Sequence, residues 1–263
     1  MYPYDKTYDH VVTVEVDHTS HIATITLDCP ENLNRFSEQL IDELSAAIDQ
    51  LRVDREIRVV ILHGVGPVSF GPGDLAVLKS KFAASLPEGQ QVMTEIGEMI
   101  RAMMFMPQPV IGVAEGQCLG GGCNLVLSTD MVIAQESAVF HELFANYSMS
   151  PDTGGLWALQ RLVGPMRAKQ LAMVAEPIGA AAAKEYGMVL DVVPDGTAME
   201  AARDLATKIA SKSPVGVAHT KDYTLQTYFQ VEADYLCLGA LSHDFRETNI
   251  AAAQKRAPEF TGE

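Results

Sequence analysis

Basic residues are scarce in this chain, and so are cysteines and long apolar runs. The 263 residues include 19 lysines and arginines against 34 aspartates and glutamates, so the formal net charge at pH 7 is −15. A nucleic acid or an anionic membrane binds a basic face, so this charge argues against both as partners. It does not exclude a small anionic ligand, because a few local basic groups and helix N-termini suffice to hold one.

The four cysteines lack the spacing of a metal site or a redox pair. Cys118 and Cys123 do not form a Cys-x-x-Cys pattern, and Cys29 and Cys237 stand alone. We therefore expect buried, reduced thiols, and the histidines share no pattern that would suggest a metal site. The first residues lack a basic segment followed by an apolar one, and no apolar run approaches membrane-spanning length. These features predict a soluble, cytoplasmic protein.

The stretch from residue 107 to residue 130 has the most specific pattern of the chain. Residues 110–114 are apolar and follow Pro109, which is typical of a short strand buried on both faces. A Glu-Gly turn, three glycines at 120–122 and a helical run over 123–127 come next. Glycines let a ligand approach the backbone, and the first N–H groups of a helix have no intrahelical partner. The stretch therefore predicts a site that stabilises negative charge on an oxygen, with a tight connection lacking any chemistry as the alternative.

Hydropathy patterns elsewhere predict an α/β chain without a second independent domain. We expect strands over residues 12–16, 23–27, 59–62, 131–134 and 138–140, and helices over 40–51, 93–106, 155–163, 167–174 and 197–211. Ser37 is expected to cap the first helix, and Thr197 with Glu200 to form a capping box at the last. Residues 64–90 are rich in Gly, Pro and Ser and are expected to form a loop.

Several motifs in the same order resemble the crotonase superfamily, the enoyl-CoA hydratase/isomerase family. The resemblance covers the glycine-rich stretch and also residues 22–34, 59–64, 151–155, 161–164, 183–189 and 254–260. It implies a crotonase-type spiral of ββα units over residues 1–196 and a C-terminal helical trimerisation region over residues 197–263. It also implies a homotrimer or hexamer. The implied substrate is an acyl-CoA thioester, with coenzyme A as part of the substrate and no permanently bound cofactor.

In this family two backbone N–H groups bind the thioester oxygen. The resemblance assigns one to Gly121, the central glycine of the triplet, and the other to a loop at residues 69–75 that departs from the family's Phe-x-Ala-Gly-x-Asp-Leu pattern. Alignment on Asp74 and Leu75 makes Gly73 the second donor, whereas alignment on the phenylalanine makes it Asp74. We favour Gly73, because this choice keeps a carboxylate off the residue that donates to a developing negative charge.

The family's hydratases use two glutamates, and the resemblance places Asn124 and Phe144 at those positions. Neither side chain is an acid or a base near neutral pH, so water addition by two glutamates is not expected. Both residues are instead candidates for the substrate pocket. Met103, from the Met-rich helix, is a third candidate, with adaptable core packing as the alternative.

Asp152 is the carboxylate that the resemblance offers in their place. It matches an aspartate that dienoyl-CoA isomerases use as acid and base, that 4-chlorobenzoyl-CoA dehalogenases use as nucleophile, and that carbon–carbon hydrolases of the family also use. An apolar wall such as Phe144 disfavours the charged form of a carboxyl, which suits proton transfer. The alternative is that Asp152 only caps the helix that begins near Gly154. His141 is either a further site residue or a cap of the preceding strand.

The resemblance also suggests residues that contact CoA. They are Asn34 and Arg35 in one loop, Asp74 and Leu75 in another, and Lys255 and Phe260 in a tail that reaches across the subunit interface in relatives. The sequence thus predicts an acyl-CoA double-bond isomerase that uses Asp152. The alternatives are a hydrolase, lyase or dehalogenase that uses the same aspartate on a CoA thioester or a β-diketone, and a non-catalytic acyl-CoA-binding protein.

Overall fold

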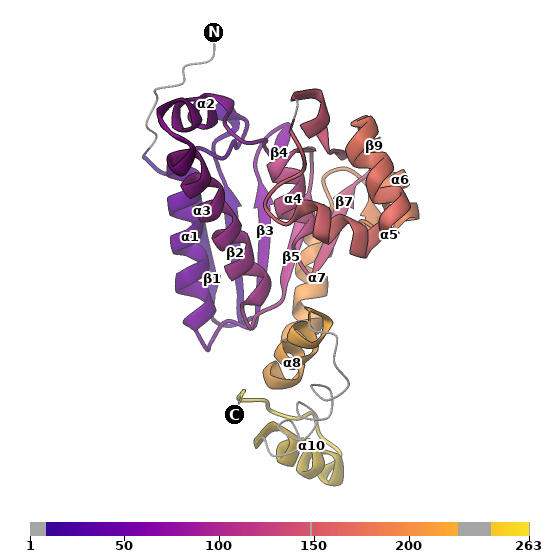
Figure 1. The fold of residues 1–263 in the computed structure, drawn as a ribbon. Coiled ribbons are helices and arrows are strands. Elements are labelled where there is room, and N and C mark those ends of the chain that lie inside the picture. Colours follow the sequence, from indigo (N-terminus) through magenta and orange to yellow (C-terminus); the bar gives the residue numbers. More distant parts are fainter. Residues whose placement is uncertain (1–8, 148, 226–242, 263) are drawn as a thin grey trace.

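Two β-sheets form the centre of the molecule, and helices cover them (Figure 1). The computed structural model describes residues 9–147, 149–225 and 243–262. The larger sheet contains β1 (Val12–Asp17), β2 (Ile22–Leu27), β3 (Val59–Gly64), β5 (Val110–Ala114), β7 (Met131–Gln135) and β10 (Asp191–Val193), in that order. The smaller sheet contains β4 (Val68–Phe70), β6 (Gln117–Leu119), β8 (Val139–His141) and β9 (Ile178–Gly179).

The chain alternates between the two sheets as it advances. β3 lies in the larger sheet and β4 in the smaller one; β5 and β6, then β7 and β8, repeat this step. Neighbours from β2 to β10 in the larger sheet pair in parallel, and only β1 pairs antiparallel, with β2. These repeats, each followed by a helix, confirm the predicted spiral of ββα units. β3 and β5, at the centre of the larger sheet, are buried on both faces, as their continuous apolar sequences require.

Helices cover both faces of the larger sheet. On one face lie α1 (Glu38–Val53), α3 (Leu86–Phe105) and the smaller sheet with α4 (Gly121–Leu127). Ser37 caps α1 by accepting the Leu40 N–H at 3.2 Å, as predicted. On the other face α7 (Ala198–Ala210) packs a row of four buried alanines against the strands. The capping box expected at α7 is not formed, because the Thr197 hydroxyl donates to the Pro194 carbonyl instead.

The loop expected over residues 64–90 is largely regular structure. It contains β4, α2 (Leu75–Ala84) and the first turn of α3. The Asp74 carboxylate accepts the Ala76 N–H at 2.9 Å and so caps α2, and the Ser85 hydroxyl accepts the Glu88 N–H and caps α3. The polar residues and prolines of this segment therefore mark the boundaries of helices rather than one long loop.

The remaining helices are η1 (Pro30–Asn32), η2 (Leu143–Tyr147), α5 (Gly155–Val174), α6 (Ala180–Tyr186), α8 (Pro214–Leu225) and α10 (His243–Gln254). α5 is interrupted at Gly164, whose φ of 74° is not helical and lies directly before Pro165. This break was expected from the Gly-Pro pair. Within the described ranges, no helix is both long and apolar enough to cross a bilayer.

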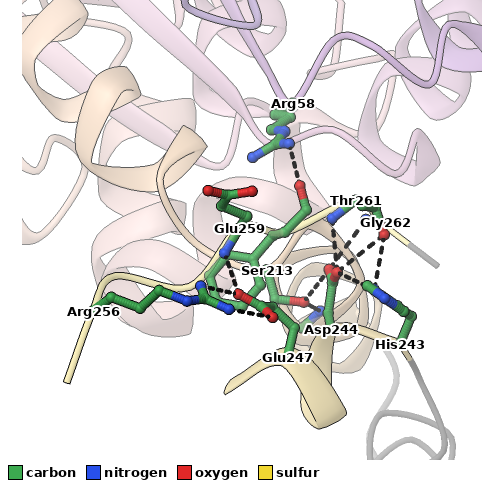
Figure 2. Close-up of polar contacts among 11 residues, drawn as sticks. Arg58, Ser213, His243, Asp244, Glu247, Arg256, Glu259, Thr261 and Gly262 are labelled. Atoms are coloured by element: carbon green, nitrogen blue, oxygen red, sulfur yellow. Dashed lines mark hydrogen bonds and ion pairs between the residues drawn. The ribbon is translucent and has the colours of Figure 1, made fainter. Parts of the chain in front are cut away.

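The C-terminal tail folds back onto α10 and the start of α8 (Figure 2). The buried Asp244 carboxylate accepts the Ser213 hydroxyl at 3.1 Å and the Thr261 N–H at 2.7 Å. Glu247 forms a two-pronged ion pair with Arg256, with 3.0 Å between Oε2 and Nη2. Hydrogen bonds from Arg256 lower the pKa of the Glu247 carboxyl to about 2. These charge-assisted bonds fix the tail on α10 of its own chain.

Candidate active site

A pocket lies between α2, α3 and the N-terminus of α4. It contains about 950 Å³ of empty space, part of which is open solvent. Apolar side chains form most of its wall, among them Phe36, Leu78, Val92, Met93, Ile96, Leu143, Phe144 and Tyr147. The polar side chains are few: Arg35, Asp74, Asp152 and Thr153. A mostly apolar pocket with a few polar groups is the usual form of a small-molecule site.

Two glycines from distant parts of the chain meet at this pocket. A Cβ placed on Gly121 would lie 3.7 Å from the Gly73 backbone nitrogen and 2.9 Å from Cε2 of Phe36. Gly121 is the first residue of α4, where an N–H has no partner within the helix. Gly120, which precedes it, has a φ of 51°, a conformation that favours glycine. The turn before α4 therefore brings the Gly121 backbone close to the Gly73 amide.

The pairing of Phe36 distinguishes Gly73 from Asp74. Phe36 forms a parallel bridge with Gly73, and its N–H donates to the Pro72 carbonyl at 3.2 Å. In a parallel pair one residue bonds to both neighbours of the residue opposite it, so the Gly73 N–H takes no part in this bridge. The bridge instead joins Phe36 to the two neighbours of Gly73, which are Pro72 and Asp74. The side chain of Asp74 caps α2.

Asp152 lines the pocket on a tightly held backbone. Its carbonyl accepts the Asn124 side-chain amide at 3.1 Å and the Gly155 N–H at 2.7 Å. Thr153, which donates its hydroxyl to the Asp152 carboxylate at 3.1 Å, has a φ of 51°, a strained value for a β-branched residue. Burial raises the pKa of the Asp152 carboxyl. The N-cap of α5 is Gly154, and no side chain caps that helix, so Asp152 is not the helix cap considered above.

A model of the enoyl-CoA hydratase/isomerase family matches residues 17–263. The chain belongs to this family. It is similar to 1,2-epoxyphenylacetyl-CoA isomerase of Escherichia coli (strain K12), with 34% identity over 92% of this chain and 95% of the relative. It is also similar to trans-2-decenoyl-(acyl-carrier-protein) isomerase of Streptococcus mutans, with 30% identity over 92% and 95%. Among solved structures, enoyl-CoA hydratase from Bacillus anthracis has a TM-score of 0.89 and 32% identity, with 97% of this chain and 100% of that chain covered.

The expected pocket residues of this family member lie at different depths. Phe144 lines the pocket, whereas Asn124 is fully buried behind it, and its amide lies 2.0 Å from where a Cβ on Gly155 would be. Met103 is 2% exposed and packs in the core. The methionine of α3 that lines the pocket is Met93, about 15 Å from Met103 along the helix axis.

Asn34, expected at the CoA portion, is instead a structural residue. It is 1% exposed, and its amide donates to the carbonyls of Val65 and Val68 at 2.9 Å each. Its Oδ1 accepts the Cys29 N–H at 2.8 Å. These bonds satisfy the amide within the fold and hold the turn that places Arg35 at the pocket.

The other residues expected to contact CoA lie far apart within one chain. Asp74 lines the pocket, and Leu75 begins α2 with a side chain outside the described residues. Lys255 follows α10 at the opposite end of the molecule (Figure 1). The Phe260 carbonyl accepts Nη2 of Arg58 at 2.6 Å, so the tail is anchored near the start of β3 (Figure 2). The contact across a subunit interface stays a prediction.

His141 lies beside the pocket, but its ring contacts a main-chain carbonyl outside it. Its Nε2 lies 2.8 Å from the Ala175 carbonyl at the end of α5, so the ring serves the fold. Cys29, Cys118 and Cys123 are buried, as expected, and Cys237 lies outside the described residues.

Glu142, for which the sequence suggested no role, is 3% exposed and directly follows β8. Burial, and then the charge of Asp152, raise the pKa of its carboxyl to about 7, against the opposing effect of the Cys123 thiol. An acidic residue between Phe140 and Phe144, which are both buried, was the available signal.

Proposed function

We propose that the protein is an acyl-CoA double-bond isomerase. The observation that carries this proposal is the position of Asp152, a carboxyl at the same pocket as Gly73 and Gly121. The resemblance places Asn124 and Phe144 where the family's hydratases have glutamates, and neither side chain can activate water. The name of the trans-2-decenoyl-(acyl-carrier-protein) isomerase supports an isomerase of enoyl groups, and that of the 1,2-epoxyphenylacetyl-CoA isomerase supports isomerisation of a CoA thioester more broadly.

In the proposed reaction the N–H groups of Gly73 and Gly121 bind the thioester oxygen. The Asp152 carboxylate removes a proton from the carbon next to the thioester carbonyl of a 3-enoyl group. The electron pair of that C–H bond moves into the carbonyl system, and a conjugated enolate forms with its charge on the bound oxygen. Asp152, now protonated, returns the proton to carbon 4, and the double bond comes to lie between carbons 2 and 3. The composition of the substrate does not change.

The surroundings of Asp152 suit this proton transfer. Burial raises the pKa of its carboxyl, which brings its basicity closer to the working pH. Asn124 and Gly155 hold the backbone carbonyl of Asp152, so the side chain starts from a fixed position. The apolar wall formed by Phe144 and its neighbours excludes water from the enolate, which favours proton return from Asp152 over protonation by solvent.

We propose that coenzyme A carries the acyl group and that Arg35 contacts its phosphates. The guanidinium belongs to a residue that lines the pocket next to Phe36, and arginine binds phosphate through paired, charge-assisted hydrogen bonds. The apolar part of the pocket, on the side of α3, then receives the acyl chain.

We also propose a homotrimer or hexamer. α5 exposes large apolar side chains that a monomer would leave in water, including Trp157, Leu162, Met166 and Met173, at 38% to 86% exposure. Apolar surface gathered on one helix is typical of a protein–protein interface, and a second copy of the chain is the partner that the family resemblance implies.

The test is turnover of trans-3-hexenoyl-CoA by the wild-type protein, Asp152→Asn and Asp204→Asn, followed by the ultraviolet absorbance of the conjugated 2-enoyl thioester, with mass detection of any hydrated or hydrolysed product. Asp204 is an exposed aspartate on α7, so its variant controls for the loss of one charge. We expect the wild type and the control to form 2-hexenoyl-CoA, and Asp152→Asn to be slower by roughly 10²–10⁴-fold.

Other outcomes contradict the proposal. Full activity of Asp152→Asn would show that Asp152 is not catalytic. A hydrated or hydrolysed product would identify a different reaction class. Saturable binding without turnover by the wild type identifies an acyl-CoA-binding protein.

A further inference from the structure

Glu142 is a buried carboxyl that the proposed reaction does not use. It directly precedes Leu143 and Phe144, which line the pocket, yet it lies behind that wall and is 3% exposed. Neither of its carboxylate oxygens makes a hydrogen bond of good geometry among the described residues, although the Cys123 thiol interacts with the carboxyl. An ionised carboxylate is costly in such a place, so burial favours the protonated form of Glu142.

The titratable groups around Glu142 come from three elements. The Cys123 thiol of α4 interacts with the carboxyl, and the Cys118 thiol of β6 interacts with Cys123 in turn. Asp152 acts from the loop before α5. His141, next along β8, turns its ring to a main-chain carbonyl at the end of α5. Among these neighbours no cation offsets a negative charge on Glu142.

The two carboxyls are coupled through their charges. Burial, and then the charge of Asp152, raise the pKa of Glu142 to about 7, and burial raises the pKa of Asp152. Two negative charges in a buried region repel one another, so a charged Asp152 disfavours the ionisation of Glu142.

We propose that Glu142 is a positioning residue whose protonated form is required for turnover. This inference rests on the proposed isomerase function. Cys123, which contacts the Glu142 carboxyl, lies two residues after Gly121, so an ionised Glu142 places a second negative charge behind the oxyanion glycines. That charge opposes formation of the enolate in a medium of low dielectric constant. The effect comes from the charge on Glu142 and not from a change in the shape of the pocket, so it depends on pH.

The experiment compares kcat/KM for trans-3-hexenoyl-CoA between pH 5.5 and pH 9 in the wild type, Glu142→Gln and Glu136→Gln. Glutamine has the shape of the protonated acid and cannot ionise. Glu136 is exposed in the turn between β7 and β8, so its variant makes the same chemical change without burial. We expect the wild type and Glu136→Gln to lose activity about tenfold per pH unit above pH 7, and Glu142→Gln to keep its plateau.

Infrared titration of the carboxyl C=O band provides a second measurement that does not depend on a variant at position 142. In the wild type we expect a protonated buried carboxyl that disappears near pH 7. In Asp152→Asn the same transition moves to lower pH, because the opposing charge has been removed.

Identical alkaline limbs in the wild type and Glu142→Gln overturn the inference, and so does a Glu142 carboxyl that is already ionised at pH 5.5. If at the same time Asp152→Asn abolishes turnover, the isomerase proposal stands and only the role of Glu142 fails. Absence of turnover by the wild-type protein overturns both.

Discussion

Replacement of Gly121 by alanine tests the two-glycine arrangement most directly. The added Cβ would lie 2.9 Å and 3.0 Å from Cε2 and Cδ2 of the Phe36 ring, closer than carbon atoms approach without displacement. Phe36 is 4% exposed, so its ring has little room to move away, and the backbone of Gly121 has to shift instead. The substitution therefore displaces the Gly121 N–H from its place beside the Gly73 amide.

The magnitude follows from the energetics of such donors. Loss of one donor typically costs roughly 10²–10³ in kcat, which corresponds to about 3–4 kcal/mol of transition-state stabilisation. We expect at least this loss for Gly121→Ala, with a smaller change in KM, because the bond to the oxygen strengthens as the enolate forms. Overpacking against Phe36 adds a stability cost of about 1–3 kcal/mol.

The assay measures kcat and KM with trans-3-hexenoyl-CoA, and urea unfolding monitors stability. Gly97→Ala in α3 is the matched control, because a Cβ on Gly97 would meet nothing within 4 Å. Phe36→Leu combined with Gly121→Ala relieves the clash and is expected to restore part of kcat. A Gly121→Ala protein with a kcat within about threefold of the wild type would refute the assignment, given the size of a donor's usual contribution.

Two further predictions concern stability and assembly. The folded protein keeps the Glu142 proton up to about pH 7, whereas the unfolded chain loses it near the ordinary value of 4.5, so the free energy of unfolding falls as pH rises through this window. Glu142→Gln removes this loss and should be more stable than the wild type by up to about 3 kcal/mol at pH 8, with little difference at pH 4; urea unfolding at both values checks this, and equal stabilities at pH 8 contradict it. Met166→Asp places a charge on the most exposed apolar side chain of α5, so light scattering should detect dissociation into smaller species, while an unchanged mass excludes this face as the interface.

Local patterns in the sequence were sufficient for most of the helices and strands. The strand over residues 110–114, the Ser37 cap and the break before Pro165 are each determined by residues within a few positions of one another. The same holds for the triple glycine that opens α4. Hydropathy period, caps and backbone constraints act at short range, and a sequence displays them directly. The prediction of a loop over residues 64–90 was wrong, because the residues that cap helices are also common in loops.

The chemical character of the site depended on contacts between distant segments. Only the tertiary structure brings Phe36 against Gly73 and Gly121, and Asn124 against the backbone of Asp152. The burial that keeps Glu142 protonated near pH 7 is likewise created by β8, α4 and the loop before α5 together. Desolvation and charge–charge interaction depend on what surrounds a group in space. The sequence by itself therefore determined the elements and the family, and the packing of those elements decided which carboxyl faces the pocket and which is buried behind it.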